Sequence, residues 1–358
     1  MFSLHIDSGR SWGGGQNQVM FTVTGLRALG HRAMLAADPE GELYRRMSEG
    51  LDLIPLAPAS DVDLAAAWRL SRLLKKIRPE VLHAHDSHAV SVAATALSIA
   101  APEPRPPLLA SRRAEFRVDR NSFSRWKYSQ VDTFIANSGA IRDRLVADGV
   151  PRAKIAVITE GVDVDRIAHM RPVDVHADFY LPHGAPVVGN VAALVPHKGQ
   201  HHLVDAAALV VREVPDVRFV IAGDGEQRAS LEKHIKDKHL EHHVFLAGFR
   251  ADALEITKGL DLFVLSSVTE GRCTALMEAM VDGQTGYLVA PRDHRAMADR
   301  IVVLLKNERL RAQMGAAAQA RARERFTVER MVEETLAVYE QLAGTHRAAG
   351  IASHAARG

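Results

Sequence analysis

Short apolar runs alternate with amphipathic segments along nearly the whole chain. An apolar run at 2–7 precedes a helical pattern at 16–30, and a helical pattern at 62–79 precedes an apolar run at 81–86. Short apolar runs between helical patterns are typical of buried parallel strands. The pattern therefore predicts an α/β fold with mainly parallel sheets.

The polar segment 166–184 interrupts this pattern and separates two series of strands and helices. With 358 residues, the chain is long enough for two domains of ordinary size. The expected division is a first domain at 1–168, a second domain at 169–325, a helix at 326–345 and a disordered tail at 346–358.

The composition excludes several classes of protein. Hydrophobic residues make up 47% of the chain and charged residues 25%, as in soluble globular proteins. No apolar run approaches the ~20 residues that span a bilayer, and the first residues do not resemble a signal peptide. The single cysteine, Cys273, excludes an internal disulfide and suits a reducing cytoplasm, where we expect the protein to reside.

Two glutamates follow the apolar run at 261–267, where a strand is expected to end. Glu270 lies in a loop with Gly271, and Glu278 lies four residues after Thr274, near which a helix is expected to begin. Loops of this kind bind phosphorylated ligands, because their free N–H groups and the helix dipole favour anions. The pair indicates either a phosphorylated ligand that carries hydroxyl groups or two solvated carboxylates.

Polar or glycine positions follow other expected strands of the second half. Lys198 comes after GNVAAL, Gly223 closes VRFVIAG, and Arg250 and Asp252 follow VFLAG. Taken singly, the lysine fits a solvated loop and the glycine fits a tight turn. The carboxyl ends of parallel strands meet along one edge of a sheet, so together these positions favour a nucleotide site there.

The second half resembles the donor domain of the family 4 retaining glycosyltransferases of the GT-B class. The pieces that carry the resemblance are Lys198-Gly199, IAGDG, VFLAGFRAD, SSVTEG, LMEAM and DGQTGYLV. The resemblance implies two Rossmann-like domains facing a cleft, with a C-terminal helix that returns to the first domain. It also implies transfer of a sugar from a nucleotide diphosphate sugar to a glycan or glycolipid hydroxyl in cell-surface polysaccharide assembly, without metal or cofactor.

The same resemblance assigns roles to the residues at the donor site. Glu270 would contact the transferred sugar and Lys198 the diphosphate, both as catalytic residues. Glu278 would hold the ribose, and Arg250 with Asp252 would border the base. The full set of donor-binding residues that the resemblance implies is Gly14, Gly15, Lys198, Gly223, Arg250, Asp252, Glu270, Gly271, Arg272, Cys273, Thr274 and Glu278.

Features at strand ends of the first half are also similar to the family. The Gly-rich turn at 12–15 contains neither GxGxxG nor a Walker lysine; it resembles the loop that touches the donor phosphate, which implicates Gly14 and Gly15. A plain structural turn is the alternative. His85 and Asp86 resemble the family's His-acid pair on the cleft side, which implies a catalytic role for His85 and acceptor binding by Asp86.

Metal binding is the alternative interpretation of the histidines near the run at 81–86. His83, His85 and His88 lie close together in sequence with Asp86, and histidines and carboxylates are metal ligands. However, His83 and His85 share one face of a strand that is expected to be buried. We therefore predict no metal site.

A basic stretch with interleaved aromatic residues begins at Arg112. It lacks the context of a nucleic-acid module, so we expect Arg112, Arg113 and Arg117 to bind a phosphorylated or acidic acceptor, and no nucleic acid. Several relatives carry a histidine in place of Arg113. The basic, amphipathic helical pattern at 68–78 suits attachment to the inner face of a membrane, although it also fits a helix that packs on its sheet.

Two departures from the family pattern concern the donor site. Ala193 stands where many relatives carry a second phosphate-binding cation. After Met280, roughly fifteen residues, enough for one strand and its loop, are missing before the strand expected at 286–291. A nucleotide-binding protein without transferase activity therefore remains an alternative, as does a nucleotide-sugar epimerase or hydrolase on the same frame.

Overall fold

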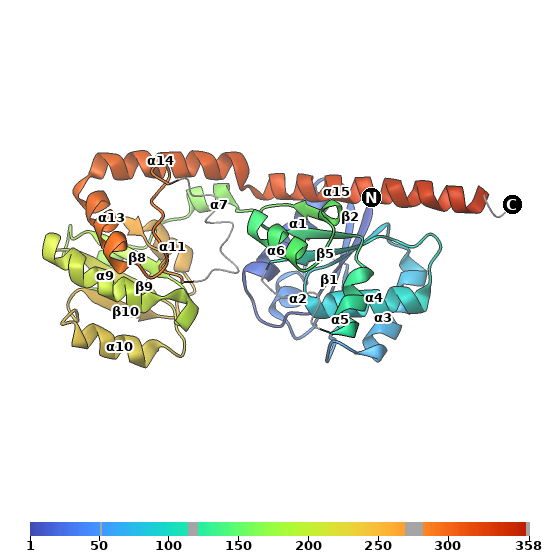
Figure 1. Cartoon of the computed structure of the whole chain (residues 1–358), viewed down its shortest axis with the longest axis horizontal. Coiled ribbons are helices and arrows are strands. Elements are labelled where there is room, and N and C mark those ends of the chain that lie inside the picture. Colours follow the sequence, from blue (N-terminus) through green and yellow to red (C-terminus); the bar gives the residue numbers. More distant parts are fainter. Residues whose placement is uncertain (51, 114–120, 269–281, 356–358) are drawn as a thin grey trace. The chain divides into compact units, whose positions relative to one another are not determined.

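A computed structural model describes residues 1–50, 52–113, 121–268 and 282–355 (Figure 1). The chain divides into two compact units, Met1–Val162 with Arg325–Gly358 and Asp163–Glu324. The sequence placed the division at 168/169, so the second unit begins a few residues earlier than expected. The end of the chain belongs to the first unit, which confirms the predicted return of the C-terminal helix.

The first unit is built on a sheet of seven parallel strands in the order β3-β2-β1-β4-β5-β6-β7. Residues of the central strands are almost wholly buried, which explains why they read as unbroken apolar runs in the sequence. The strands are β1 (Phe2–Asp7), β2 (Arg32–Ala37), β3 (Leu53–Pro55), β4 (Val81–Ala84), β5 (Leu108–Arg112), β6 (Thr133–Ala136) and β7 (Ile155–Val157).

Helices follow the strands of this sheet, and several begin at a polar cap. The side chains of Asp63, Asp86, Asn121 and Ser138 each accept a hydrogen bond from a backbone N–H in the first turn of a helix. The helices of the unit are α1 (Gly14–Ala28), α2 (Glu42–Arg46), α3 (Leu64–Ile77), α4 (Ser87–Ala100), α5 (Ser122–Ser129), α6 (Gly139–Ala147), the 3₁₀ turn η1 (Arg152–Lys154) and α15 (Val328–Ala355).

The returning helix α15 packs on α1. Val332 lies so close to Gly25 that a side chain at Gly25 would overlap it, which accounts for a glycine in the middle of a helix, where it costs about 0.5–1 kcal/mol relative to alanine. The sequence predicted that this helix ends at 345 and that a disordered tail follows. The structure gives the helix the bounds Val328–Ala355; the disorder of the tail stays a prediction.

The second unit is built on a parallel sheet in the order β10-β9-β8-β11. Its strands are β8 (Val187–Val191), β9 (Arg218–Ala222), β10 (Val244–Gly248) and β11 (Leu262–Phe263). Its helices are α7 (Val164–His169), α8 (Val175–Asp178), the 3₁₀ turn η2 (Pro196–Lys198), α9 (Gln200–Glu213), α10 (Arg228–Asp237), α11 (Ala253–Lys258), α13 (His294–Lys306) and α14 (Glu308–Arg325).

Two expected strands of the second unit differ from the prediction. The apolar run at 261–267 forms only the two-residue strand β11. The strand expected at 286–291 is absent from the described residues, where an isolated bridge joins Asp282 to Gly286. A strand needs a neighbour with which to exchange hydrogen bonds, and the described chain supplies none for 286–291.

Candidate functional site

The loops that follow β8, β9 and β10 lie side by side at the carboxyl edge of the second sheet. The Leu194 N–H donates to the Asp224 carbonyl at 3.0 Å, and the Gly223 N–H donates to the Gly248 carbonyl at 2.7 Å. Gly223 has φ of +145°, and a side chain there would collide with the Ala192 carbonyl. The loops therefore approach so closely that only glycine fits at 223.

Lys198 lies at the end of η2, in a turn that continues through Gly199 at φ +63°. The Ser266 hydroxyl donates to the Lys198 carbonyl at 3.0 Å, so the loop after β11 packs on this turn. The Val268 N–H adds a second link by donating to the His197 carbonyl at 2.9 Å. The half-buried lysine is thus held at the edge where the sequence predicted a nucleotide.

The other predicted residues of this loop and its helix lie outside the described residues. They are Glu270, Gly271, Arg272, Cys273, Thr274 and Glu278. Their roles remain predictions.

Arg250 and Asp252 form a two-bond ion pair after β10. The Asp252 carboxylate accepts from the Arg250 Nε at 2.7 Å and from its Nη2 at 2.6 Å, while Asp178 accepts from Nη1 at 2.7 Å. These hydrogen bonds, above all that to Asp252, raise the pKa of Arg250. A base that contacts Arg250 would therefore meet a guanidinium already shared by two carboxylates.

At the carboxyl edge of the first sheet, Gly14 and Gly15 lie in the first turn of α1 rather than in a turn before it. The N–H groups of a first helical turn lack partners within the helix. An added side chain at either glycine would meet no described atom within 4 Å. This position is open to an anion, as the predicted phosphate contact requires.

Asp86 joins the loop after β1 to the start of α4. Its carboxylate accepts from the Ser8 N–H at 2.6 Å, from the Ser8 hydroxyl at 2.7 Å and from the Ala89 N–H at 2.9 Å. Burial raises the pKa of nearby Asp7 to about 6, and the charge of Asp86 adds to the rise. Asp86 therefore holds the loop after β1 against the start of α4. Its contact with an acceptor stays a prediction.

His85 is buried, and both of its ring nitrogens have partners. Nε2 lies 3.0 Å from Nδ1 of His5, and Nδ1 lies 3.5 Å from the Ser111 hydroxyl. Arg113 Nη1 also donates to the His85 backbone carbonyl at 3.4 Å. The catalytic role expected for His85 stays a prediction, and its imidazole is engaged inside the unit.

The structure groups the histidines differently from the sequence. His88 is exposed and lies 3.6 Å from Asp61, whereas His5 of β1 joins His83 and His85. One ring nitrogen from each of these three histidines lies within 4.8 Å of the other two. Sequence reasoning missed His5 because the pairing of β1 with β4, which sets His5 beside His83, is not visible in either strand alone.

Some side chains of the predicted basic surface are buried. Arg112 and Lys127 are 5% and 2% exposed. Arg112 Nη1 donates to the Tyr128 hydroxyl at 3.2 Å, so this side chain supports the core. Arg113 pairs with Glu160 at 3.2 Å, and Arg117 lies outside the described residues.

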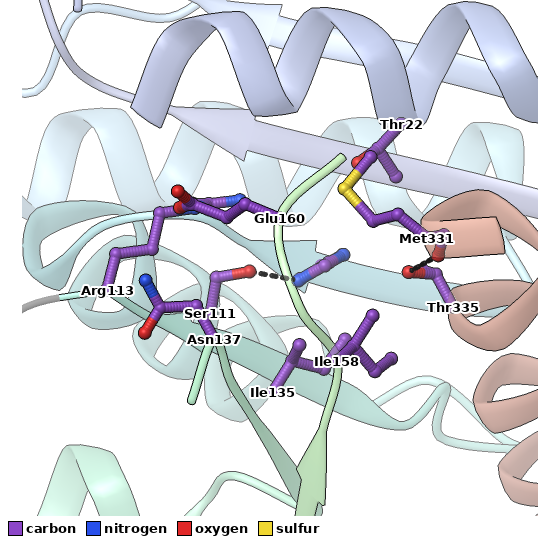
Figure 2. Close-up of a pocket in the computed structure, with 10 residues that line it drawn as sticks. Thr22, Ser111, Arg113, Ile135, Asn137, Ile158, Glu160, Met331 and Thr335 are labelled. Carbon is purple, nitrogen blue, oxygen red and sulfur yellow. Dashed lines mark hydrogen bonds and ion pairs between the residues drawn. The ribbon is translucent and has the colours of Figure 1, made fainter. Parts of the chain in front are cut away.

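A small cavity lies where β5, β6 and β7 end, beside the ion pair of Arg113 and Glu160 (Figure 2). The Asn137 side chain lines it and is almost wholly buried. Burial raises the pKa of Glu160, and the Arg113 charge opposes the rise. Sequence reasoning missed Glu160 and Asn137, although both are polar residues at expected strand ends.

Comparison with known proteins identifies the family of this chain. Residues 12–166 match the model described as Glycosyltransferase Family 4, and residues 175–281 match the model described as Glycosyl transferases group 1. The chain belongs to glycosyltransferase family 4. The two matches together cover most of both units, and the family predicted from the sequence motifs is confirmed.

The family 4 chain has curated relatives of moderate identity. It is 28% identical over 213 residues to poly(ribitol-phosphate) alpha-N-acetylglucosaminyltransferase of Staphylococcus aureus, a match that covers 52% of the chain and 43% of that protein. It is 27% identical over 289 residues to GDP-mannose-dependent alpha-mannosyltransferase of Mycobacterium tuberculosis, covering 75% of the chain and 73% of that protein. The chain spans less than half of the first relative's length.

The solved structure of HepE from Anabaena, in complex with UDP, shares the fold of the family 4 chain. The two agree with a TM-score of 0.81 at 21% identity, over 95% of this chain and 100% of HepE. The likeness confirms the predicted GT-B class, with two Rossmann-like units.

Proposed function

We propose that the protein is a retaining, metal-independent glycosyltransferase. It moves a sugar from a nucleotide diphosphate sugar to a hydroxyl of a glycan or glycolipid in cell-surface polysaccharide assembly. The observation that carries this proposal is the meeting of Lys198 and the Gly223 turn at one carboxyl edge. The names of the relatives, which include a poly(ribitol-phosphate) glycosyltransferase, support the reaction class.

The proposed chemistry is stabilisation of a diphosphate leaving group. Lys198, the N–H groups from Gly271 to Thr274 and those of Gly14 and Gly15 oppose the charge that develops on the diphosphate as its bond to the sugar breaks. Glu270 positions the sugar and Glu278 holds the ribose. No metal or cofactor is required in this scheme, because cationic and N–H groups of the protein stabilise the leaving group.

The acceptor is expected at the first unit's carboxyl edge. Arg113 is half-buried there beside Glu160, and the side-chain amide of Asn137 lines the same cavity with a hydrogen-bond donor and an acceptor (Figure 2). Arg112 and Asp86 have hydrogen-bond partners inside the unit. Their proposed role is to hold this edge in place. Arg117 remains a proposed acceptor contact.

A thermal-shift panel tests the donor part of this function. UDP, GDP, ADP, CMP and their common sugar conjugates are added without metal and then with Mg²⁺. Saturation at a hundred times Kd stabilises the native state by about 2.7 kcal/mol, which raises Tm by several degrees. We expect one nucleotide to shift Tm without metal, and one conjugate of it to shift Tm further.

A shift that requires Mg²⁺ would contradict the metal-independent site. The absence of any shift would contradict donor binding itself. Product analysis without acceptor, using the best conjugate, separates a transferase from a hydrolase or an epimerase.

We also propose that the protein attaches peripherally to the cytoplasmic face of a membrane through α3. None of the described helices combines the length and apolar character that crossing a bilayer requires. On α3, Leu64 and Trp68 are 64% and 52% exposed, and the exposed cations of the same helix are Arg69, Arg72, Lys75 and Lys76. Exposed aromatic and aliphatic side chains beside cations suit an anionic lipid surface.

Vesicle sedimentation tests this attachment. We expect binding to vesicles that contain phosphatidylglycerol, weak binding to pure phosphatidylcholine, and at least a several-fold loss in a Leu64→Ala/Trp68→Ala variant. Leu254→Ala, which removes a 51% exposed leucine from the second unit, is the control. Equal sedimentation of the three proteins with anionic vesicles would exclude α3 as the attachment surface.

A further inference from the structure

A chain of hydrogen bonds crosses the first unit from the returning helix to the edge of its sheet. The Tyr339 hydroxyl lies 2.5 Å from Nδ1 of His83, whose Nε2 lies 2.8 Å from the Ser111 hydroxyl. The order of the chain is Tyr339, His83, Ser111, His85, His5 and Ser3, with later links of 3.5, 3.0 and 3.0 Å. Every member is at most 7% exposed.

Neighbouring strands bring these residues together. His5 lies on β1, His83 lies on β4 and Ser111 lies on β5, and these three strands are adjacent in the sheet. His5 and His83 are paired in the register of β1 and β4. Tyr339 comes from α15, which lies 256 residues further along the chain but in the same unit.

The three histidines are neutral at pH 7. Burial lowers the pKa of His5 to about 3, and burial lowers the pKa of His83 and of His85 well below the usual value. A neutral imidazole has one N–H donor and one acceptor nitrogen. A histidine that accepts a hydrogen bond at one ring nitrogen therefore donates from the other, so the direction of one hydrogen bond determines the direction of the next.

The phenol sets that direction. A phenolic hydroxyl is able to donate or to accept, and with its O–H donating along the short link to His83, Nδ1 of His83 is the acceptor. His83 must then carry its proton on Nε2 and donate to Ser111. The Ser111 hydroxyl in turn donates to Nδ1 of His85, which leaves the His85 proton on Nε2 and directs it at His5.

We propose that Tyr339 is a positioning residue for the transfer reaction, acting through His83 and Ser111 to fix the tautomer and ring orientation of His85. The backbone carbonyl of His85, together with Asp86, stands at the carboxyl edge of the first sheet, where the acceptor is proposed to bind. The tautomer part of the inference stands on the hydrogen-bond geometry and the burial of the histidines; its effect on the reaction rests on the proposed function. Helix α15 thereby contributes a positioning residue to the first unit in addition to packing on its surface.

A shared metal ion is the competing interpretation of the three histidines. The rings of His5 and His85 are nearly parallel, at 12°, and their facing nitrogens are 3.0 Å apart. Two nitrogens that point at each other form a hydrogen bond, whereas metal ligands point at a common third position. Each ring nitrogen also has a hydrogen-bond partner already, so the geometry favours the chain.

Imidazole nitrogen spectroscopy of the whole ¹⁵N-labelled protein tests the chain directly. We expect His83, His85 and His5 as neutral Nε2–H tautomers at pH 7. Tyr339→Phe should change the Nδ1 signals of His83 and mix the tautomers of His85. In a Ser111→Ala background, Tyr339→Phe should no longer affect His85, because the link between them is broken.

The activity readout separates positioning from simple stabilisation. We expect Tyr339→Phe to lower kcat roughly tenfold, because a displaced reacting geometry costs rate, while the Kd for the donor nucleotide stays unchanged. Tyr44→Phe is the control, since Tyr44 is a half-buried tyrosine of the same unit outside the chain.

Several results would overturn the proposal. The proposed chain of hydrogen bonds would be excluded by any of three results for His5, His83 and His85. These are Nδ1–H tautomers, tautomers that do not respond to Tyr339→Phe, and imidazole signals that shift when Zn²⁺ is added. Altered tautomers with an unchanged kcat would exclude the positioning role. If no donor is turned over by the unaltered protein, the proposed function fails, while the tautomer measurements still decide the chain.

Discussion

Gly223→Ala is expected to unfold the second unit at temperatures where the unaltered protein is stable. The backbone at Gly223 has φ of +145°, a conformation that costs other residues about 1–3 kcal/mol. An added Cβ would also collide with the carbonyl of Ala192, which is backbone and cannot rotate away. We expect a combined loss of about 3 kcal/mol or more in the free energy of unfolding, measured by urea titration.

Gly315→Ala is the matched control for this prediction. Gly315 lies inside α14 of the same unit, and an added side chain would meet no described atom within 4 Å. Alanine is the better helix former, so this variant should gain up to about 1 kcal/mol. Equal destabilisation of the two variants would show that the strain at Gly223 does not cause the loss in the free energy of unfolding.

Gly223 illustrates what the sequence could predict at the donor site and what it could not. The motif GDG after an apolar run predicted a tight turn or a close approach at a strand's carboxyl end. The structure adds that the closest neighbour is the loop after β8, through Ala192 and Leu194. A local pattern locates the turn, but the partner comes from a segment some thirty residues earlier, because the pairing of parallel strands is not encoded in either strand alone.

The site residues that the sequence missed share this non-local origin. His5, Glu160 and Tyr339 each read as an ordinary part of a strand end or a helix. They become parts of a site only because β1, β4 and β7 share one sheet and α15 returns to it. The family resemblance implied the return of the helix but gave no reason to single out its tyrosine.

The errors at element ends have local causes. Glycine disfavours helix interiors, so the sequence placed Gly14 and Gly15 before α1, whereas in the first turn their unpaired N–H groups are an advantage for binding an anion. The apolar run at 286–291 has the composition of a strand but no neighbour among the described residues. Hydrophobic pattern therefore predicts where a strand is able to form, and tertiary pairing decides whether it does.

Lys198→Ala is expected to lower kcat/KM by about two to three orders of magnitude, because Lys198 is the cation assigned to the diphosphate leaving group. Ala193 supplies no charge at the position where the family resemblance implies a second cation. The turn should survive the substitution, since its bond from Ser266 ends on the Lys198 carbonyl and Gly199 keeps its positive φ. Steady-state kinetics with the donor found by thermal shift measure the effect.

The matched control is Lys306→Ala, which removes an exposed lysine of the same unit that pairs with Glu213 at 2.7 Å. Such exposed surface pairs contribute little to stability, so Tm should fall slightly at most while kcat/KM stays constant. Lys198→Arg should recover part of the lost activity, because it restores the charge without the compact geometry of an ammonium group. Equal kinetics for Lys198→Ala and Lys306→Ala would remove Lys198 from the donor site. Leaving-group stabilisation would then fall to the N–H groups of Gly14, Gly15 and residues 271–274, which are also proposed to contact the diphosphate.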